Sequence, residues 1–254
     1  MKSLFYSAGY YDGISNVSKR SAEAMLPRIF EAVQPKSWIE IGSGTGSWTK
    51  TAIELGIPEC RAVDGPWVKN SELLIPPDKF LKHDLTQPLN LNRTFDLALS
   101  LEVAEHLDQR FADTIVQTLV SHADVVVFGA AIPMQGGTHH VNEQWPSYWI
   151  SKFVGQGYEC FDFVRATCWN DDKIAPFYIQ NTFLFIKSGR HPALASKLRS
   201  TIADIYSRSH NLAFVHPRQY LGIATMEAIS ARLMLKQGPK VLATRVLGRL
   251  GVRI

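Results

Sequence analysis

Long apolar runs are missing from this 254-residue sequence. No stretch reaches the ~18 consecutive apolar residues of a membrane-spanning helix, and the opening MKSLFYSAGYYDG lacks the apolar core of a secretory signal. We therefore expect a cytoplasmic protein. Cysteine is scarce, and Cys60, Cys160 and Cys168 are too scattered for a CxxC pair. Neither a disulfide framework nor a zinc knuckle is therefore indicated, and we expect reduced cysteines that serve in packing.

The composition is that of a globular chain, with 46% hydrophobic and 20% charged residues, long enough for one large domain with an appendage. Its charge is uneven. Residues 190–254 hold eleven Lys and Arg against two acidic residues, a formal charge of +9, which leaves −5 for residues 1–189 of the total of +4. We expect a main domain at 1–189 and a basic helical C-terminal extension at 190–254, which meet different partners.

Apolar runs alternate with segments of helical periodicity along most of the chain. The pattern predicts helices at 18–33, 48–56, 103–123 and 147–157. It predicts strands at 37–44, 59–65, 79–85, 95–102, 124–133, 158–169 and 177–188. The last two strands have no predicted helix between them and are expected to pair antiparallel. The sequence therefore predicts an α/β fold, with a doubly wound, mostly parallel seven-stranded sheet, an antiparallel strand near one edge and a C-terminal helical appendage.

A glycine-rich turn, EIGSGTG, lies where the first strand meets its helix. Glycine permits a positive φ and close backbone approach, which a nucleotide-like ligand requires at this edge, although a tight structural turn uses similar residues. Asp64 ends the second strand, where a carboxylate can accept from both ribose hydroxyls. Asp84 closes the third and could accept from an adenine amine, and Trp67 could cover that ring. A solvated strand end and a core aromatic are the alternatives for these two residues.

The segments EIGSGTG, AVDG, HDL and FDLALSLEVAEHL, in this order, resemble the successive motifs of class I S-adenosylmethionine-dependent methyltransferases over residues 18–188. The resemblance implies S-adenosylmethionine as cofactor and in-line displacement at its methyl group by O, N, C or S. It also implies where the cofactor-binding residues lie. The methionine part and ribose would be surrounded by Glu40, Gly42, Ser43, Gly44 and Gly46. Asp64 would hold the ribose, Asp84 and Leu85 the adenine, and Leu101 and Glu102 would lie beneath the methyl donor.

The loop after the fifth strand, QGGTHHVNEQW (135–145), carries two adjacent histidines. Neighbouring residues of an extended loop point in roughly opposite directions, so we expect one of His139 and His140 to face the substrate. That histidine is the candidate general base or substrate ligand, with Glu143 orienting its imidazole. Alternatively, the two histidines bind backbone or solvent, or ligate a metal.

A metal alternative comes from Glu102, Glu105 and His106, spaced to share one face of a helix start. Methyltransferases acting on the 3′-terminal 2′-hydroxyl of small RNAs resemble this arrangement. The same motif occurs in relatives that bind no metal, and no RNA-binding extension is evident before the domain. We therefore assign no metal ligands. Metal-dependent RNA 2′-O-methylation and a non-catalytic cofactor-binding scaffold are kept as alternatives.

Aromatic residues suggest the kind of acceptor. One helical face is predicted to be aromatic, either as part of the core or as a surface that stacks on a sugar; it consists of Trp145, Tyr148, Trp149 and Phe153. Near the N-terminus, Tyr10 and Tyr11 could form a lid. We favour methyl transfer to an oxygen or nitrogen of a small metabolite, possibly a sugar or glycosylated compound, over nucleic acid. In the extension, arginines spaced by four residues are compatible with an oligomer-forming helix or with peripheral membrane contact. These are Arg245, Arg249 and Arg253.

Overall fold

A computed structural model of the chain describes residues 8–208, with side chains from 16 to 205. They belong to a compact unit spanning Met1–Leu212. The side chains of Tyr10 and Tyr11, and all of Arg245, Arg249 and Arg253, lie outside the described residues, so the predictions made for them stay predictions.

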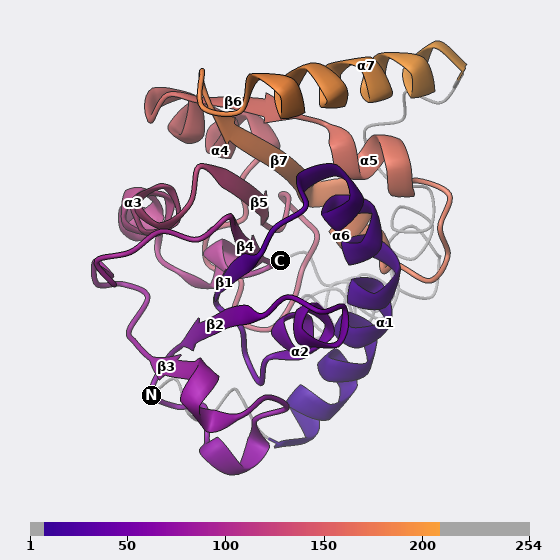
Figure 1. Cartoon of the computed structure of the whole chain (residues 1–254). Coiled ribbons are helices and arrows are strands. Elements are labelled where there is room, and N and C mark those ends of the chain that lie inside the picture. The colour runs from indigo at the N-terminus through magenta and orange to yellow at the C-terminus, as the bar shows by residue number, and fades with distance from the viewer. Residues whose placement is uncertain (1–7, 209–254) are drawn as a thin grey trace, which may run out of the picture. The chain divides into compact units, whose positions relative to one another are not determined.

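A seven-stranded sheet forms the centre of the unit (Figure 1). The strands lie in the order β3-β2-β1-β4-β5-β7-β6. The first five are parallel, and β7 runs antiparallel to both β5 and β6. The predicted mostly parallel sheet with an antiparallel strand near one edge is confirmed. The bounds are β1 Ser37–Ile41, β2 Glu59–Asp64, β3 Phe80–Lys82, β4 Leu97–Leu101, β5 Val125–Gly129, β6 Tyr158–Phe161 and β7 Thr182–Lys187.

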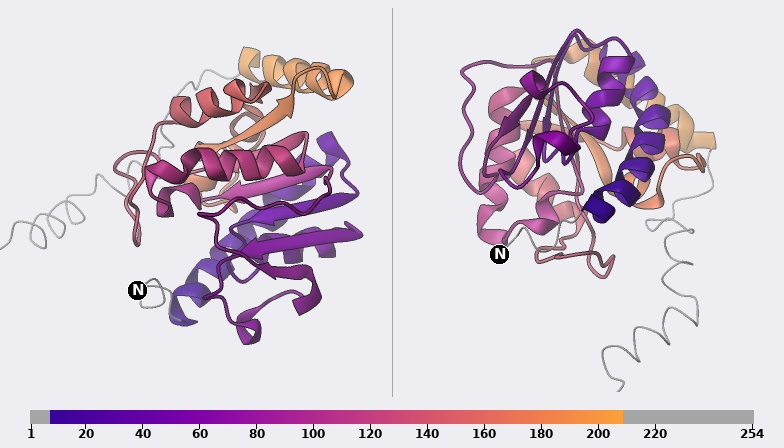
Figure 2. Two further views of the ribbon diagram at one scale, coloured as in Figure 1. Left: turned by 90° about the vertical axis from the view of Figure 1, so that its left-hand side faces the viewer. Right: turned by 90° about the horizontal axis from the view of Figure 1, so that it is seen from below.

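Helices cover both faces of the sheet (Figure 2). One face packs against α1, α2, α5, α6 and α7, and the other against α3 and α4. Leu97 and Leu99 of β4 contribute to the first core, and Ala98 between them to the second. Both faces of a central strand are thus buried, which is why the strands read as continuous apolar runs. The bounds are α1 Ala8–Val33, α2 Ser47–Glu54, α3 Ala112–His122, α4 Pro146–Gly155, α5 Phe163–Cys168, α6 Pro176–Asn181 and α7 Pro192–Arg208.

Two predicted strands are wrong over part of their length. The strand expected at 158–169 ends at Phe161 and is followed by α5, and the first half of the one expected at 177–188 is α6. Two short helices therefore separate β6 and β7. Pro176 explains the second error, because proline at the first position of a helix supplies a suitable φ and needs no N–H partner.

The helix expected at 103–123 begins only at Ala112. Two 3₁₀ turns, Ala104–His106 and Gln109–Phe111, precede it. Glu102 has a φ of 55°, in the left-handed region, so the backbone turns sharply after β4 instead of entering a helix. The prediction that Glu102, Glu105 and His106 share a helical face is therefore wrong.

The described part of the extension is one helix, α7. Its residues Ala195 and Leu198 are buried in the core that also contains α1 and α5. This helix therefore belongs to the packed unit, whereas the division of the chain at residue 189 stays a prediction.

Candidate active site at the carboxyl edge of the sheet

The glycine-rich turn after β1 is left-handed at three positions. Gly42, Gly44 and Gly46 have φ values of 83°, 54° and 90°. A Cβ on Gly42 would lie 2.4 Å from a methyl carbon of Val103, so glycine is required there by both conformation and space. The N–H groups of Gly42 and Ser43 both donate to the Val63 carbonyl, at 2.8 and 3.1 Å, which fixes the turn beside the end of β2.

Asp64, the last residue of β2, points its carboxylate at this turn. One oxygen accepts from the N–H of Gly44 at 2.6 Å and the other from the N–H of Gly65 at 2.5 Å. The side chain is buried, and two backbone donors set its direction. The structure thus brings Asp64 and the predicted glycine turn into direct contact.

Glu40 lies below the turn, within the sheet. Its carboxylate accepts from both the N–H and the hydroxyl of Thr49, and that hydroxyl accepts from the indole N–H of Trp38 at 3.0 Å. Burial raises the pKa of Glu40 to about 8, against the opposing effect of the Thr49 hydrogen bonds. The sequence indicated Glu40 but gave no sign of its partner Thr49, which comes from the first turn of α2.

We expect Glu40→Gln to make folding stability less dependent on pH. The pKa of Glu40 is higher in the folded state than in the unfolded state. The contribution of this carboxyl group to folding stability is therefore least favourable at high pH, where the group is ionised. Its contribution is present below pH 4.5 and is lost as pH rises to about 8. Between pH 5 and 8.5 the variant should gain on the order of a few kcal/mol relative to the parent chain. Chemical denaturation at several pH values measures this, and parallel stability curves would contradict it.

The predicted adenine-side residues lie at the ends of β2 and β3. The Trp67 ring packs on Gly65 so closely that a Cβ there would lie 2.1 Å from it. Leu85 is buried. Asp84 is exposed and accepts from the N–H and hydroxyl of Thr86, at 3.0 and 2.8 Å. The structure gives Asp84 a capping role in this turn, and its contact with adenine stays a prediction.

Glu102 follows the buried Leu101 at the end of β4 and is held by two amides. Its oxygens accept from Gln135 at 2.6 Å and from Asn181 at 2.9 Å. Asn181 also donates to Gln135 at 2.9 Å, which closes a three-residue network. Burial raises the pKa of Glu102. The sequence gives no sign of either amide, because the pattern around Asn181 predicts a strand and Gln135 lies in a loop 33 residues after Glu102.

The two histidines of the 135–145 loop differ in their surroundings. His139 is exposed, with a φ of 59°. The His140 side chain is only 11% exposed, and its Nδ1 lies 2.9 Å from a Glu143 carboxylate oxygen. Glu143 also accepts from the N–H groups of Met134 and Gly136, both at 2.8 Å. The loop therefore closes around Glu143, which orients His140 and not His139.

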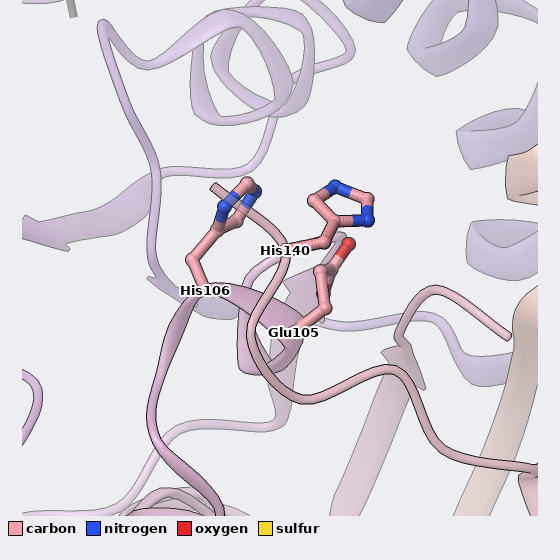
Figure 3. Close-up of side chains that lie close together, drawn as sticks. All are labelled: Glu105, His106 and His140. Atoms are coloured by element: carbon pink, nitrogen blue, oxygen red, sulfur yellow. The ribbon is translucent and has the colours of Figure 1, made fainter. Parts of the chain in front are cut away.

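His140 also lies next to two residues of the turn after β4. One ligand atom from each of Glu105, His106 and His140 lies within 4.8 Å of the others (Figure 3). The two imidazoles pack edge to face, with centroids 4.9 Å apart. Burial and the neighbouring His140 lower the pKa of His106 to about 4, so its ring is neutral near pH 7. Burial and the nearby Glu102 raise the pKa of Glu105 well above its usual value.

The comparisons with known proteins agree with this architecture. Human N-acetylserotonin methyltransferase, solved in complex with S-adenosylmethionine, is similar with a TM-score of 0.52 and 15% identity. The similarity covers 72% of this chain and 57% of that one. The chain has the class I methyltransferase fold. DesVI of Streptomyces venezuelae has the same fold, with a TM-score of 0.51 and 11% identity over 70% of this chain and 95% of that one. No family model and no curated protein matches the sequence.

In the methyltransferase fold, the carboxyl ends of the parallel strands meet at one edge. The predicted site residues lie at or after such strand ends: Asp64 ends β2, the glycine turn follows β1, Glu102 follows β4 and the 135–145 loop follows β5. Within residues 8–208, no helix is both long and apolar enough to cross a membrane.

Proposed function

We propose that the chain transfers a methyl group from S-adenosylmethionine to an oxygen or nitrogen of a small metabolite, with a sugar or glycosylated compound as the favoured acceptor class. The contact between Asp64 and the glycine turn carries this proposal. A buried carboxylate beside a left-handed glycine turn is suited to a ribose, because it can accept from vicinal hydroxyls while the backbone approaches closely.

The residues present fit the cofactor. Gly42 leaves no room for a side chain, and the Asp64 carboxylate is fixed by Gly44 and Gly65. Glu40 and Ser43 would complete the surroundings of the ribose and the methionine part, with Trp67, Asp84 and Leu85 toward the adenine. When bound, the cofactor supplies an activated methyl group, so the protein has to position the nucleophile and accept a proton where one is lost.

The acceptor side would be formed by the 135–145 loop. Glu143 accepts at Nδ1 of His140, which leaves Nε2 with a lone pair that can take a proton from an acceptor hydroxyl. Exposed apolar side chains lie on this loop and directly before it, with Met134 82%, Val141 54% and Trp145 56% exposed. They provide a surface against which the ring of a sugar or a glycosylated compound could pack.

Titration calorimetry with S-adenosylmethionine tests the proposal. The parent chain should bind, and Asp64→Ala should weaken binding roughly tenfold to a hundredfold through the loss of hydrogen bonds to a charged group. Asp78→Ala, which removes an exposed aspartate before β3, is the matched control and should leave affinity unchanged. If the parent chain does not bind S-adenosylmethionine, the proposal is wrong.

Turnover is tested by release of S-adenosylhomocysteine across a panel of hydroxylated and amino acceptors, including sugars and glycosides. Release with a small acceptor supports the proposed activity. Binding of the cofactor without release for any acceptor, RNA included, would favour the scaffold alternative. Release of S-adenosylhomocysteine only with an RNA that carries a free 2′-hydroxyl on its 3′-terminal nucleotide would favour RNA methylation.

A further inference from the structure

A pair of glycines, Gly136 and Gly137, lies at the start of the loop that carries His140, and the two are required for different reasons. Gly136 has a φ of 70°, in the left-handed region that favours glycine. The φ of Gly137 lies outside this region. A Cβ on Gly137, however, would lie 2.2 Å from Nε2 of His140. The second glycine is therefore required by the space that the imidazole occupies, and the sequence gives no sign of this contact.

The Gly137 backbone packs on the face of the His140 ring. The added carbon would lie 2.2 Å from Nε2, 2.5 Å from Cε1 and 2.7 Å from Cδ2. Such similar distances to three ring atoms place this carbon over the ring face and not in the ring plane. The lone pair of a neutral imidazole nitrogen lies in the ring plane. Gly137 thus covers the ring but leaves open the direction in which Nε2 accepts a proton.

Two side chains complete the surroundings of the His140 imidazole. Its Nδ1 lies 2.9 Å from a carboxylate oxygen of Glu143. The ring of His106 packs against it edge to face, with centroids 4.9 Å apart (Figure 3). Glu143 is itself fixed, because it accepts from the N–H groups of Met134 and Gly136, both at 2.8 Å. The imidazole is therefore only 11% exposed and is held by a carboxylate, a second ring and a glycine backbone.

The main chain after His140 is fixed to the turn after β4. The N–H groups of Val141 and Asn142 donate to the carbonyl of Glu105, at 2.9 and 3.1 Å. With the main chain fixed, the freedom left to the imidazole is rotation about its side-chain bonds. The close packing of Gly137 on the ring face restricts this rotation, because a ring that turned out of its plane on this side would meet the backbone.

We propose that Gly137 is a positioning residue for methyl transfer, which together with Glu143 holds His140 in the orientation and tautomer that leave Nε2 ready to receive a proton. This rests on the proposed function, in which His140 is the base. In that step the acceptor atom forms a bond to the methyl carbon, and the carbon–sulfur bond breaks with its electron pair left on sulfur. The proton that the acceptor loses passes to Nε2. Displacement of a catalytic group by about 1 Å can cost about a hundredfold in rate.

The test compares the full-length parent chain with Gly137→Ala. Spectra that correlate imidazole nitrogens with ring protons report the tautomer of a histidine, recorded at pH 8, above the ordinary histidine pKa of about 6.5. His140→Asn identifies the His140 signals by their loss. The parent should carry the proton on Nδ1, where Glu143 accepts. Gly137→Ala should mix the two tautomers, because the new methyl group displaces the ring from Glu143. With the acceptor that the parent uses, kcat should fall by about a hundredfold, and affinity for S-adenosylmethionine should stay unchanged.

Gly155→Ala is the matched control. Its φ is also outside the left-handed region, and a Cβ there meets nothing within 4 Å, so the tautomer of His140 and kcat should match those of the parent. A second comparison covers the case in which Gly137→Ala does not fold. In a His140→Ala background the ring is absent, so Gly137→Ala should fold and should not lower the midpoint of chemical denaturation any further.

Three results would overturn the proposal. They are an unchanged His140 tautomer in Gly137→Ala, an unchanged kcat, and a failure of Gly137→Ala to fold even in the His140→Ala background. Failure of the methyl-transfer proposal has a different appearance. A parent chain that releases no S-adenosylhomocysteine with any acceptor would contradict that function, whereas the imidazole spectra would still decide whether Gly137 positions His140.

Discussion

Replacing Gly42 with alanine should lower the free energy of unfolding by about 2–5 kcal/mol and weaken the binding of S-adenosylmethionine. Two costs add. A non-glycine residue at a φ of 83° costs about 1–2 kcal/mol. The new methyl group would lie 2.4 Å from Val103, and relief of such overpacking costs about 1–3 kcal/mol. Because Gly42 also positions the N–H that contacts β2, a shift of this backbone disturbs the turn around Asp64. Chemical denaturation and cofactor titration measure the two effects.

Gly56 offers a matched control for this prediction. Its φ is 90°, and a Cβ there would meet nothing within 4 Å. Gly56→Ala should therefore show only the conformational cost, about 1–2 kcal/mol, with cofactor binding intact. Val103→Ala in the Gly42→Ala background should recover part of the steric cost and none of the conformational cost. Equal losses for Gly42→Ala and Gly56→Ala would show that the contact with Val103 is easily relieved.

The second large effect is expected from Asn181→Asp. Asn181 is 3% exposed and donates to oxygens of both Glu102 and Gln135. Aspartate removes these donors and places another carboxyl group 2.9 Å from the Glu102 oxygen. We expect a loss of about 2–4 kcal/mol in unfolding free energy, because buried acceptors lose their partner and a further charge lacks compensation. Turnover should fall as well, since Glu102 lies at the end of β4 beside the proposed methyl donor.

The pH dependence distinguishes charge from lost hydrogen bonds. A buried aspartate next to Glu102 has a raised pKa, so its penalty should grow as pH rises from 5.5 to 8. Asn181→Leu, similar in size, removes the donors without adding an ionisable group and should show a smaller increase over the same range. An Asn181→Asp variant whose loss of stability is the same at both pH values would contradict the electrostatic argument.

Much of the fold could be predicted because its signals are local. A parallel strand buried on both faces reads as an apolar run, and β4 and β5 are fully buried along their length. The α6 segment could not be recognised in this way. The run FYIQNTFLFI is apolar apart from Gln180, Asn181 and Thr182, and only Pro176 before it indicates that a helical turn precedes the strand.

The site was predictable where it depended on strand ends and not where it depended on side-chain partners. Asp64 and the glycine turn could be placed together because both follow neighbouring parallel strands. The pairing of Glu143 with His140 fits the three-residue spacing, but the choice between His139 and His140 depends on the positive φ at His139, which histidine does not signal. The burial of Glu105 depends on the loop that covers it, 35 residues further along the chain at His140.

The reversed direction of β7 determines when the site can form. Because β7 runs antiparallel to β5, its amino end lies at the edge of the sheet where the parallel strands have their carboxyl ends. Asn181 immediately precedes β7 and therefore lies at this edge. Its hydrogen bond to Glu102 spans 79 residues. During synthesis, all five parallel strand ends leave the ribosome before this residue does, so Glu102 lacks this hydrogen bond until β7 pairs with β5. Completion of the amide network is therefore coupled to closure of the sheet, a late and long-range step of folding.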